Sequence, residues 1–359
     1  MMTEAAGDRA PRASVVVVTT VNAAGLARCL RSLAALPPDD PPFETIVVLN
    51  GAEEDVRDVA AGASGVRVVE SVVNRGFAGG SNLGRAAASG EFIVLLHDDS
   101  EAQEGWLSAL VRCADEHSEA GAIGGRVLNP DGTLQYAGAV VWRDGTTRPV
   151  SAADGDFSER RAVDYSGSSS LLVRKASWDA VGGMDDELYP AYYVDADLAM
   201  AIRARGEAIL YEPGARTLHV KSASSSPRMT TFYSARNRER FCAKWPELLA
   251  AQEEAGEGPE ALERAFARSA AELERMRAAG PPPSGPAPAA VQPADDRRFL
   301  RMDRAVKNAL IERLTAEIEA LHATIRRKDS ELTVQEAALH ELHAAKSAVA
   351  QRPVERDDT

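Results

Sequence analysis

Short apolar runs alternate with helical patterns through residues 14–96, and this alternation limits the possible fold more than any other feature. The runs are strand-sized and rich in β-branched residues, and they cover 15–18, 45–49, 66–69 and 92–96. Between them, apolar residues recur at helical spacing over 26–36, 56–61 and 79–88. Uniformly apolar strands separated by helices are typical of a parallel sheet that is covered on both faces. We therefore predict an α/β fold with a doubly wound, mostly parallel sheet.

The chain continues with strands and helices in a looser order. The turn Asn129-Pro130-Asp131-Gly132 joins two strands predicted within 124–141, and 151–161 is predicted to be a polar loop. Further strands are predicted at 171–173 and 209–211, and helices at 178–181 and 195–205. Gly206 follows the last of these helices, as glycine often does at a helix C-terminus. We expect residues 14–245 to form one domain.

The last third of the sequence differs in composition. Residues 246–279 are rich in Ala, Glu and Arg and predict a helical extension, and 280–297 is a Pro- and Ala-rich linker. Over 298–350 apolar residues recur every seven positions, which predicts a coiled coil, with a single solvated helix as the alternative. One seam consists of Ile311, Ile318, Ile325, Leu332 and Leu339, and the other of Leu314, Leu321 and Leu342, interrupted by Lys328 and Gln335. We expect the ends, 1–13 and 351–359, to be disordered.

Charge and composition exclude several classes of protein. The formal net charge is −13, and a nucleic-acid binder needs a basic face, so nucleic acid is not an expected partner. No apolar run approaches the roughly 20 residues of a membrane span, and none forms the apolar core of a signal peptide. Cys29, Cys113 and Cys242 are far apart in the sequence, which is typical of reduced thiols. We therefore expect a cytoplasmic protein without a transmembrane span.

Two polar segments lie where such sheets bind ligands. His97-Asp98-Asp99-Ser100 follows the apolar run 92–96, and ligands bind at the carboxyl ends of parallel strands. Carboxylates there can hold Mg2+ or Mn2+ and leave positions open for phosphate oxygens, although a capped turn is the alternative. Residues 74–84 place four glycines and two asparagines before a helix, which would allow the backbone to approach phosphate or sugar atoms. This segment is neither a P-loop nor a dinucleotide fingerprint.

Several segments carry a family resemblance through their order along the chain. They are Val-Val-Val-Val-Thr-Thr-Val-Asn at 15–22, Asn-Arg-Gly-Phe-Ala-Gly-Gly-Ser-Asn-Leu-Gly at 74–84, Leu-Leu-His-Asp-Asp-Ser at 95–100, and later pieces at 129–135, 182–186, 194–198 and 232–238. In this order they resemble family 2 glycosyltransferases of the GT-A fold, in particular the bacterial rhamnosyltransferase-like branch. The resemblance covers 14–245 and implies a GT-A domain with a Rossmann-like nucleotide-binding half, followed by the helical and coiled-coil extension.

The resemblance also implies roles for individual residues. The positions matching donor-binding residues are Thr19, Asn22, Asn50 and Asn82, with Asp98 on the ribose and metal side and Arg236 facing the donor phosphates. Asp99 and His219 match the metal-binding positions, and Asp195 matches the general base. Simpler roles stay open, because Asp195 also fits a helix N-cap, His219 fits loop packing and Arg236 fits a surface ion pair. His97 would only orient a neighbour.

The implied activity is the inverting, metal-dependent transfer of a sugar from a nucleotide-diphosphate donor to a hydroxyl group. The donor would be a dTDP- or UDP-sugar, with dTDP-rhamnose favoured, and the cofactor Mg2+ or Mn2+. A glycan or lipid-linked acceptor in bacterial cell-surface polysaccharide assembly would bring the cytoplasmic protein to the inner face of the plasma membrane. The coiled coil would supply a homodimer or a partner helix.

Two departures from the family pattern favour a different function. Leu49 stands where the family usually has an aspartate that contacts the nucleotide, and Val194 stands where it usually has a glutamate. The alternative is therefore a catalytically weak or inactive protein of the same fold that acts as a scaffold through its coiled coil. A nucleotidylyltransferase is disfavoured, because no lysine or arginine follows the first strand before Arg28.

Overall fold

The computed structural model describes residues 10–155, 157–220, 227–280, 282 and 296–350. The predicted disorder at 351–359 and at most of 1–13, and most of the predicted linker 280–297, lie outside the described residues. Contacts between Cα atoms divide the chain into two units, Met1–Asp303 and Arg304–Thr359. No helix in the described ranges is long and apolar enough to cross a membrane.

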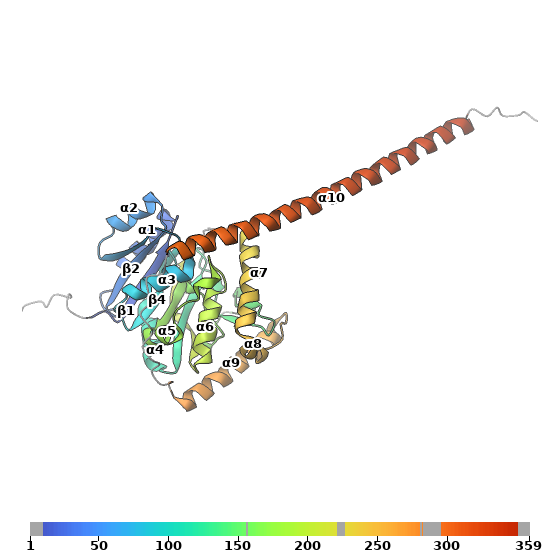
Figure 1. Ribbon diagram of the computed structural model, residues 1–359. Coiled ribbons are helices and arrows are strands. Elements are labelled where there is room, and N and C mark those ends of the chain that lie inside the picture. Colours follow the sequence, from blue (N-terminus) through green and yellow to red (C-terminus); the bar gives the residue numbers. More distant parts are fainter. Residues whose placement is uncertain (1–9, 156, 221–226, 281, 283–295, 351–359) are drawn as a thin grey trace, which may run out of the picture. The chain divides into compact units, whose positions relative to one another are not determined.

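Most of the first unit is a mixed sheet with helices packed against it (Figure 1). The main strands are β1 (Ala13–Thr19), β2 (Phe43–Asn50), β3 (Val66–Ser71), β4 (Phe92–Leu95), β5 (Ser100–Ala102), β6 (Ala120–Leu128), β7 (Leu134–Tyr136), β10 (Arg161–Ala162), β11 (Leu171–Arg174) and β12 (Ala208–His219), while β8 (Ala139–Val141) and β9 (Thr147–Pro149) form a separate hairpin. The helices are α1 (Ala23–Ala34), α2 (Glu54–Gly62), α3 (Gly76–Ala87), α4 (Trp106–Glu116), α5 (Lys175–Val181), α6 (Val194–Ala204), α7 (Pro227–Lys244), α8 (Pro246–Ala250), α9 (Pro259–Ala279) and α10 (Asp296–Ala350), with single 3-10 turns η1 (Ala152–Asp154), η2 (Ser168–Ser170) and η3 (Asp186–Leu188).

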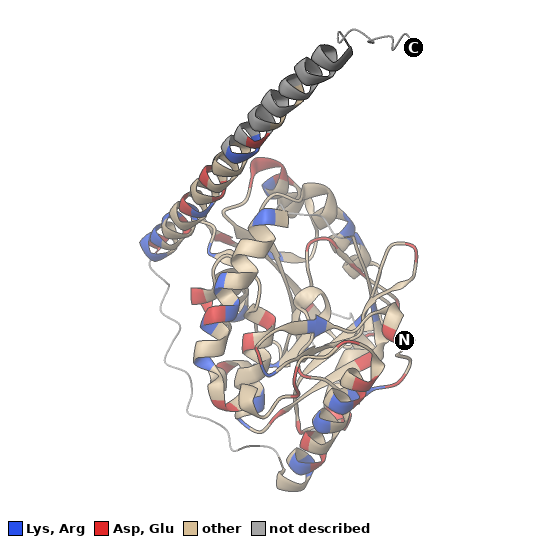
Figure 2. Ribbon diagram, turned by 90° about the vertical axis from the view of Figure 1, so that its right-hand side faces the viewer, with Lys and Arg blue, Asp and Glu red and all other residues tan. Residues whose placement is uncertain are grey.

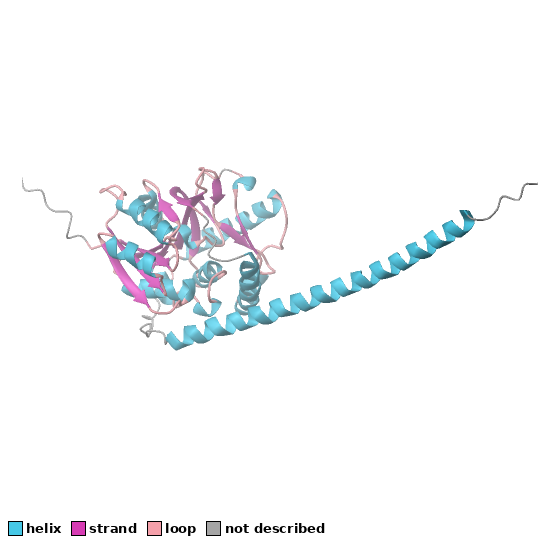
Figure 3. Ribbon diagram, turned by 90° about the horizontal axis from the view of Figure 1, so that it is seen from above, coloured by secondary structure: helices cyan, strands magenta, loops and turns pink. Residues whose placement is uncertain are grey.

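The sheet has the predicted doubly wound, mostly parallel architecture. Its strand order is β10-β12-β6-β11-β4-β1-β2-β3, with β5 beside β12 and β7 beside β6. The strands β4, β1, β2 and β3 are mutually parallel, whereas β11 runs antiparallel to β4 and β6. Helices lie on both sides of the strands (Figure 3). The polar residues that follow β1 and β4 therefore come together at one edge.

The side chains of β1 explain why this run is apolar throughout. Val15 and Val17 pack into a core with α1, α2 and α4, while Val16 packs into a second core on the opposite face of the sheet. Successive side chains of a strand point to opposite faces, so a strand covered on both sides needs apolar residues at every position. Two layers of helices thus require the pattern seen in the sequence.

The glycines of residues 74–84 have a role that the sequence analysis did not predict. The helix α3 begins at Gly76 rather than at residue 79, so Gly79 and Gly80 lie inside it. A Cβ atom on Gly80 would lie 2.6 Å from Val18, and one on Gly84 would lie 2.3 Å from Val16. These glycines therefore let α3 lie directly against the sheet. The segment is a packing face in this structure, and not an open glycine turn.

The predicted helical extension consists of two helices packed onto the domain. Residues 246–279 contain α8 and α9, separated by residues 251–258. Arg268 of α9 donates two hydrogen bonds of 2.7 Å to the carboxylate of Asp164, which is fully buried beside the sheet. Ala261 and Leu262 of α9 belong to the core on that face of the sheet. The extension is thus part of the first unit.

The second unit consists of the remainder of α10. Both charge signs occur along the described part of this helix (Figure 2), with an Arg313–Glu317 pair at 3.2 Å one turn apart. Ile311, Ile318 and Ile325, which share one predicted seam, are each more than half exposed at 60, 52 and 54%. The helix itself agrees with the heptad pattern, and its pairing into a coiled coil stays a prediction.

Candidate active site

The segment after β4 places three acidic or imidazole side chains at the carboxyl edge of the sheet. Leu96 follows β4, His97, Asp98 and Asp99 come next, and the short strand β5 then pairs antiparallel with the end of β12. In this pairing Ser100 lies opposite His219, and the Val220 N–H donates a 3.0 Å hydrogen bond to the Asp99 carbonyl. The β5–β12 ladder therefore brings together residues more than a hundred positions apart.

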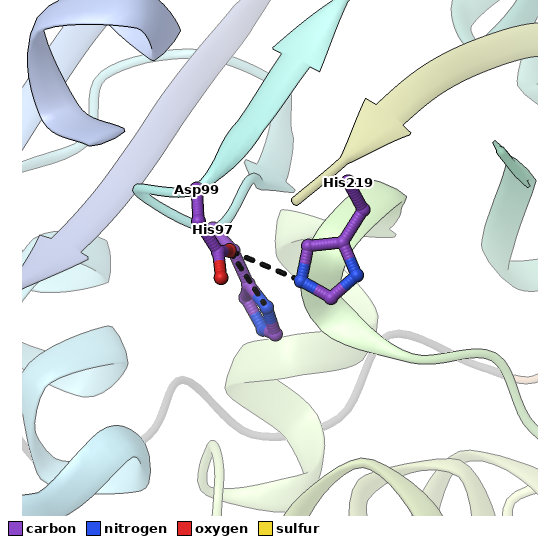
Figure 4. A group of neighbouring side chains, drawn as sticks. All are labelled: His97, Asp99 and His219. Atoms are coloured by element: carbon purple, nitrogen blue, oxygen red, sulfur yellow. Dashed lines mark ion pairs between the residues drawn. The ribbon is translucent and has the colours of Figure 1, made fainter. Parts of the chain in front are cut away.

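His97, Asp99 and His219 form a compact cluster with the composition of a metal site (Figure 4). One ligand atom from each lies within 4.8 Å of the others. Asp99 Oδ1 is 3.0 Å from His219 Nε2 and 4.0 Å from His97 Nδ1. Burial, with the neighbouring charge of His219, lowers the pKa of His97 to about 4, so its imidazole is neutral at pH 7 and can offer a lone pair. Asp99 and His219 are thus brought together as predicted, and His97 joins them.

The chemistry of these donors fits a divalent cation. One carboxylate and two imidazoles supply three ligands, and a divalent ion of the Mg2+ or Mn2+ kind takes about six. The remaining positions would be available to water or to phosphate oxygens. Two nitrogen donors suit a transition-metal ion such as Mn2+ better than Mg2+, which prefers oxygen ligands alone. The residues present therefore fit a metal that also binds a substrate.

Asp98 points toward the first strand instead of toward this cluster. Its carboxylate accepts a 2.7 Å hydrogen bond from the Thr19 hydroxyl and a 3.4 Å bond from the Asn22 amide. Burial raises the pKa of Asp98 to about 6, although both hydrogen bonds act in the opposite direction. Asn22 also caps α1 by accepting from the Gly25 N–H at 3.0 Å. The three predicted donor-binding residues thus form one polar group at the end of β1.

Asp195 lies in the first turn of α6 and accepts a hydrogen bond from the Ser168 hydroxyl. The N-cap of this helix is Tyr193, so Asp195 does not have the capping role that the sequence left open. Burial raises the pKa of Asp195 to about 6, although Ser168 lowers it. A carboxyl group with a pKa near the working pH can accept a proton during a reaction and release it afterwards.

The backbone before Asp195 is strained. Tyr192 and Tyr193 both have positive φ, at 73° and 65°, a region that bulky side chains rarely adopt. Such strain persists only where the surroundings impose it, and it is frequent at functional sites. Here the Tyr193 hydroxyl donates to the Gly145 carbonyl at 3.0 Å, and the Tyr192 hydroxyl lies 2.8 Å from Thr230 Oγ1. These contacts fix the turn that presents Asp195.

Asn50 and Asn82 make hydrogen bonds to the protein backbone, and the Asn50 amide also donates to Asn74 Oδ1 at 3.3 Å. The Asn50 amide donates to the Gly76 carbonyl at 3.0 Å and accepts from the Arg75 N–H at 2.8 Å. Asn82 donates to the carbonyl of Met184 at 2.7 Å and accepts from its N–H at 2.9 Å. Both side chains thus hold the ends of α3 and its neighbouring loop, and their contact with a nucleotide stays a prediction.

Arg236 lies on α7, where its guanidinium donates to the Tyr189 carbonyl and, at 2.8 Å, to Asn237 Oδ1. Burial lowers the pKa of Arg236, and the neighbouring charge of Arg240 adds to that effect. A role in facing the donor phosphates is not tested by these contacts. They place the guanidinium beside the loop that precedes α6.

Two functional candidates were not identified from the sequence. His97 was expected only to orient a neighbour, yet it is one of the three clustered side chains; its position next to the Asp pair was the available signal. Ser168, the hydrogen-bond donor to Asp195, belongs to a run of three serines in η2 that carries no recognisable pattern. Its role depends on the chain path from β10 to β11, which local sequence does not encode.

Known proteins resemble this chain in sequence. Residues 14–181 match the family model described as glycosyl transferase family 2. An O-antigen biosynthesis protein of Myxococcus xanthus is 30% identical over 40% of this chain and 12% of its own length. An N-acetylglucosaminyl-diphospho-decaprenol L-rhamnosyltransferase of Mycobacterium tuberculosis is 26% identical over 63% of this chain and 82% of its own. The chain spans less than a quarter of the length of the first two curated relatives that it matches.

Solved structures resemble this chain in fold. GalNAc-T7 with UDP, GalNAc and Mn2+ aligns with a TM-score of 0.54 and 16% identity, covering 67% of this chain and 49% of that one. The mannosyltransferase PcManGT from Pyrobaculum calidifontis, with GDP-Man and Mn2+, aligns with a TM-score of 0.51 and 14% identity, covering 83% and 81%. At these identities the likeness concerns the fold alone, which is the predicted GT-A fold.

Proposed function

We propose a metal-dependent, inverting sugar transfer for this chain, which belongs to glycosyl transferase family 2, within its rhamnosyltransferase-like branch. The donor would be a nucleotide-diphosphate sugar and the acceptor a hydroxyl group. The observation that carries the proposal is the His97–Asp99–His219 cluster at the carboxyl edge of the sheet. The two solved structures of the same fold are complexes with Mn2+, which supports the choice of ion.

Different residues of the site would bind the metal and the donor in such a reaction. His97, Asp99 and His219 would hold a divalent cation, and that cation would neutralise the charge that develops on the leaving diphosphate. Asp98, held by Thr19 and Asn22, offers carboxylate oxygens to the hydroxyl groups of the donor. The polar edge formed by β1 and β4 would therefore bind the nucleotide and its phosphates.

Asp195 would act as the general base. Its carboxylate would take the proton of the acceptor hydroxyl while the acceptor oxygen bonds to the anomeric carbon. The bond from that carbon to the diphosphate oxygen breaks at the same time, and its electron pair leaves with the nucleoside diphosphate. A single displacement of this kind inverts the anomeric configuration. The Ser168 hydroxyl, which donates to Asp195, would keep the carboxylate turned toward the acceptor.

The two departures from the family pattern lie in the protein interior. The side chains of Leu49 and Val194 are 4% and 3% exposed, and both belong to the hydrophobic cores. They contribute packing at positions where the family usually has acidic groups. The carboxylates of Asp98, Asp99 and Asp195 remain, so an active enzyme is favoured over an inactive scaffold.

The finer features of the proposal follow from the relatives. The mycobacterial relative is a rhamnosyltransferase, which favours a rhamnosyl donor, dTDP-rhamnose, ahead of a UDP-hexose. Its decaprenol-linked acceptor and the O-antigen role of the Myxococcus relative favour a lipid-linked or glycan acceptor of cell-surface assembly. Lipid-linked acceptors would place the enzyme in the cytoplasm at the inner face of the membrane. The exposed isoleucines of α10 favour a homodimer formed through this helix.

Calorimetric titration of donors tests the proposal. dTDP-rhamnose, UDP-glucose, UDP-galactose, UDP-N-acetylglucosamine and GDP-mannose would be titrated with and without Mn2+. The wild-type chain should bind one donor only with Mn2+, and Asp99→Ala should lose that binding. Asp58→Ala, which removes an exposed carboxylate from α2, is the matched control. If no donor binds with Mn2+, the proposal is wrong and the scaffold alternative is favoured.

A further inference from the structure

Gln135 contacts the candidate metal ligand His219 through the ring nitrogen that Asp99 does not use. Gln135 Oε1 lies 2.6 Å from His219 Nδ1, whereas Asp99 Oδ1 lies 3.0 Å from Nε2. A metal can bind only the ring nitrogen that carries no proton. The partner of Nδ1 therefore decides whether Nε2 is available on the side of Asp99.

Gln135 and His219 lie on two strands that both pair with β6. Leu134 of β7 pairs with Leu128 of β6, and Leu128 in turn pairs with Leu218 of β12. The Gln135 side chain reaches both the ring and the backbone carbonyl of His219. The contact therefore joins two strands that do not pair with each other.

The orientation of the Gln135 amide follows from its other partners. Gln135 Nε2 donates to Asn129 Oδ1 at 2.9 Å and to the His219 carbonyl at 3.2 Å. Both partners are acceptors, so the nitrogen must face them and the oxygen must face the imidazole. An amide oxygen can only accept, so Nδ1 of His219 must carry a proton. Nε2 faces the Asp99 carboxylate, where a bound cation would take the place of a proton.

Three more residues continue this series of hydrogen bonds from Gln135 to the protein surface. The Asn129 amide donates to Thr133 Oγ1 at 2.9 Å, and the Thr133 hydroxyl donates to Asp131 Oδ1 at 2.6 Å. A carboxylate accepts and does not donate, so each hydrogen bond in the series has its donor on the side of His219. The turn between β6 and β7 thus carries a series of hydrogen bonds, all of one direction, that runs from His219 Nδ1 to the Asp131 carboxylate.

We propose that Gln135 is a positioning residue of the metal site. Supported by Asn129, Thr133 and Asp131, it holds the His219 proton on Nδ1 and presents Nε2 to a divalent cation together with Asp99. This inference rests on the proposed metal-dependent function. Partners that orient a histidine ligand in this way change metal affinity by about 10- to 100-fold when they are removed.

Mn2+ titration of the full chain tests the inference. Gln135→Leu should weaken Mn2+ binding about 10- to 100-fold, and saturating Mn2+ should restore donor binding. Gln135→Glu should keep most of the affinity, because a carboxylate still accepts from Nδ1–H. Thr133→Val should weaken Mn2+ binding by less than Gln135→Leu. Thr146→Val is the matched control, since Thr146 donates to Asp144 at 2.6 Å in a second Asp-Gly-Thr turn.

A double-mutant cycle separates positioning from general damage. In a His219→Ala background, Gln135→Leu should have no further effect on Mn2+ affinity, because the ligand that it orients is gone. An unchanged affinity in a folded Gln135→Leu variant, or an equal loss in both backgrounds, would overturn the positioning role of Gln135 and leave the proposed metal site standing. If the wild-type chain binds no Mn2+, the proposed metal site is wrong, and the positioning role of Gln135 is wrong with it.

Discussion

Replacing Asp195 with asparagine should stabilise the folded protein and greatly slow sugar transfer. In the folded chain burial raises the pKa of Asp195 from 3.8 to about 6. A shift of roughly 2 units corresponds to about 3 kcal/mol, at about 1.4 kcal/mol per unit. This value is an upper limit, because the side chain is partly exposed. Asparagine does not ionise, and its amide oxygen can still accept from Ser168.

The sign of the effect depends on pH. Below about pH 4 the Asp195 carboxyl is protonated in both the folded and the unfolded chain, so the substitution should change stability little. Between pH 4 and about 6 the unfolded chain loses the proton first, and the stability of the wild type falls as pH rises. Above pH 6 the full difference of up to about 3 kcal/mol should favour Asp195→Asn. Urea unfolding at pH 4 and pH 7.5 measures this difference.

Asp185→Asn is the matched control with the opposite sign. Although burial acts to raise it, the pKa of Asp185 is lowered overall by the Lys244 ammonium at 2.8 Å. Its substitution should therefore destabilise the chain at pH 7.5 and still at pH 4, and the loss should disappear only below pH 3.8, as the pH falls through the lowered pKa. Transfer rates should fall by about 10² to 10⁴ in Asp195→Asn only. An Asp195→Asn variant that is no more stable than wild type at pH 7.5, or that transfers sugar at the normal rate, would refute the reasoning.

Three further substitutions test the packing and the assembly. Gly84→Ala should destabilise by at least about 1–3 kcal/mol in thermal unfolding, because its Cβ would lie 2.3 Å from a β1 side chain, whereas Gly62→Ala has open space and should be tolerated; equal effects would contradict the packing of α3. Asp164→Asn should cost about 3–5 kcal/mol in urea unfolding, since it removes the buried carboxylate that pairs with the partly buried Arg268, and a loss below 1 kcal/mol would contradict this anchor of α9. Ile318→Asp should convert a dimer to a monomer in analytical ultracentrifugation if α10 pairs as proposed, and a wild-type monomer would contradict the pairing.

The architecture of the first half could be predicted because strand burial is a local property. Val15, Val16 and Val17 must be apolar when both faces of β1 are covered, so the sequence pattern reports the two helix layers directly. The glycines of α3 were misinterpreted for a related reason. Close packing on the sheet and close approach to a ligand both require glycine, and composition alone does not distinguish them.

The residues of the candidate site could be predicted where polar side chains follow the carboxyl end of a strand. Asp98 and Asp99 lie three and four residues after the last residue of β4, and the edge of the sheet brings Asp98 to Thr19. The contacts of Ser168 and Gln135 arise from strand pairings between distant segments, such as β12 with β6, which no local pattern specifies. The family resemblance supplied His219, and the structure supplied its neighbours.

Electron paramagnetic resonance of bound Mn2+ tests the central claim most directly. The wild-type chain with Mn2+ and a nucleoside diphosphate should show hyperfine coupling of the metal to both histidine nitrogen and diphosphate phosphorus. The nitrogen coupling should weaken in His97→Ala and in His219→Ala, while the phosphorus coupling remains. A Mn2+ signal with no nitrogen and no phosphorus coupling would contradict a metal-dependent sugar transfer at this site.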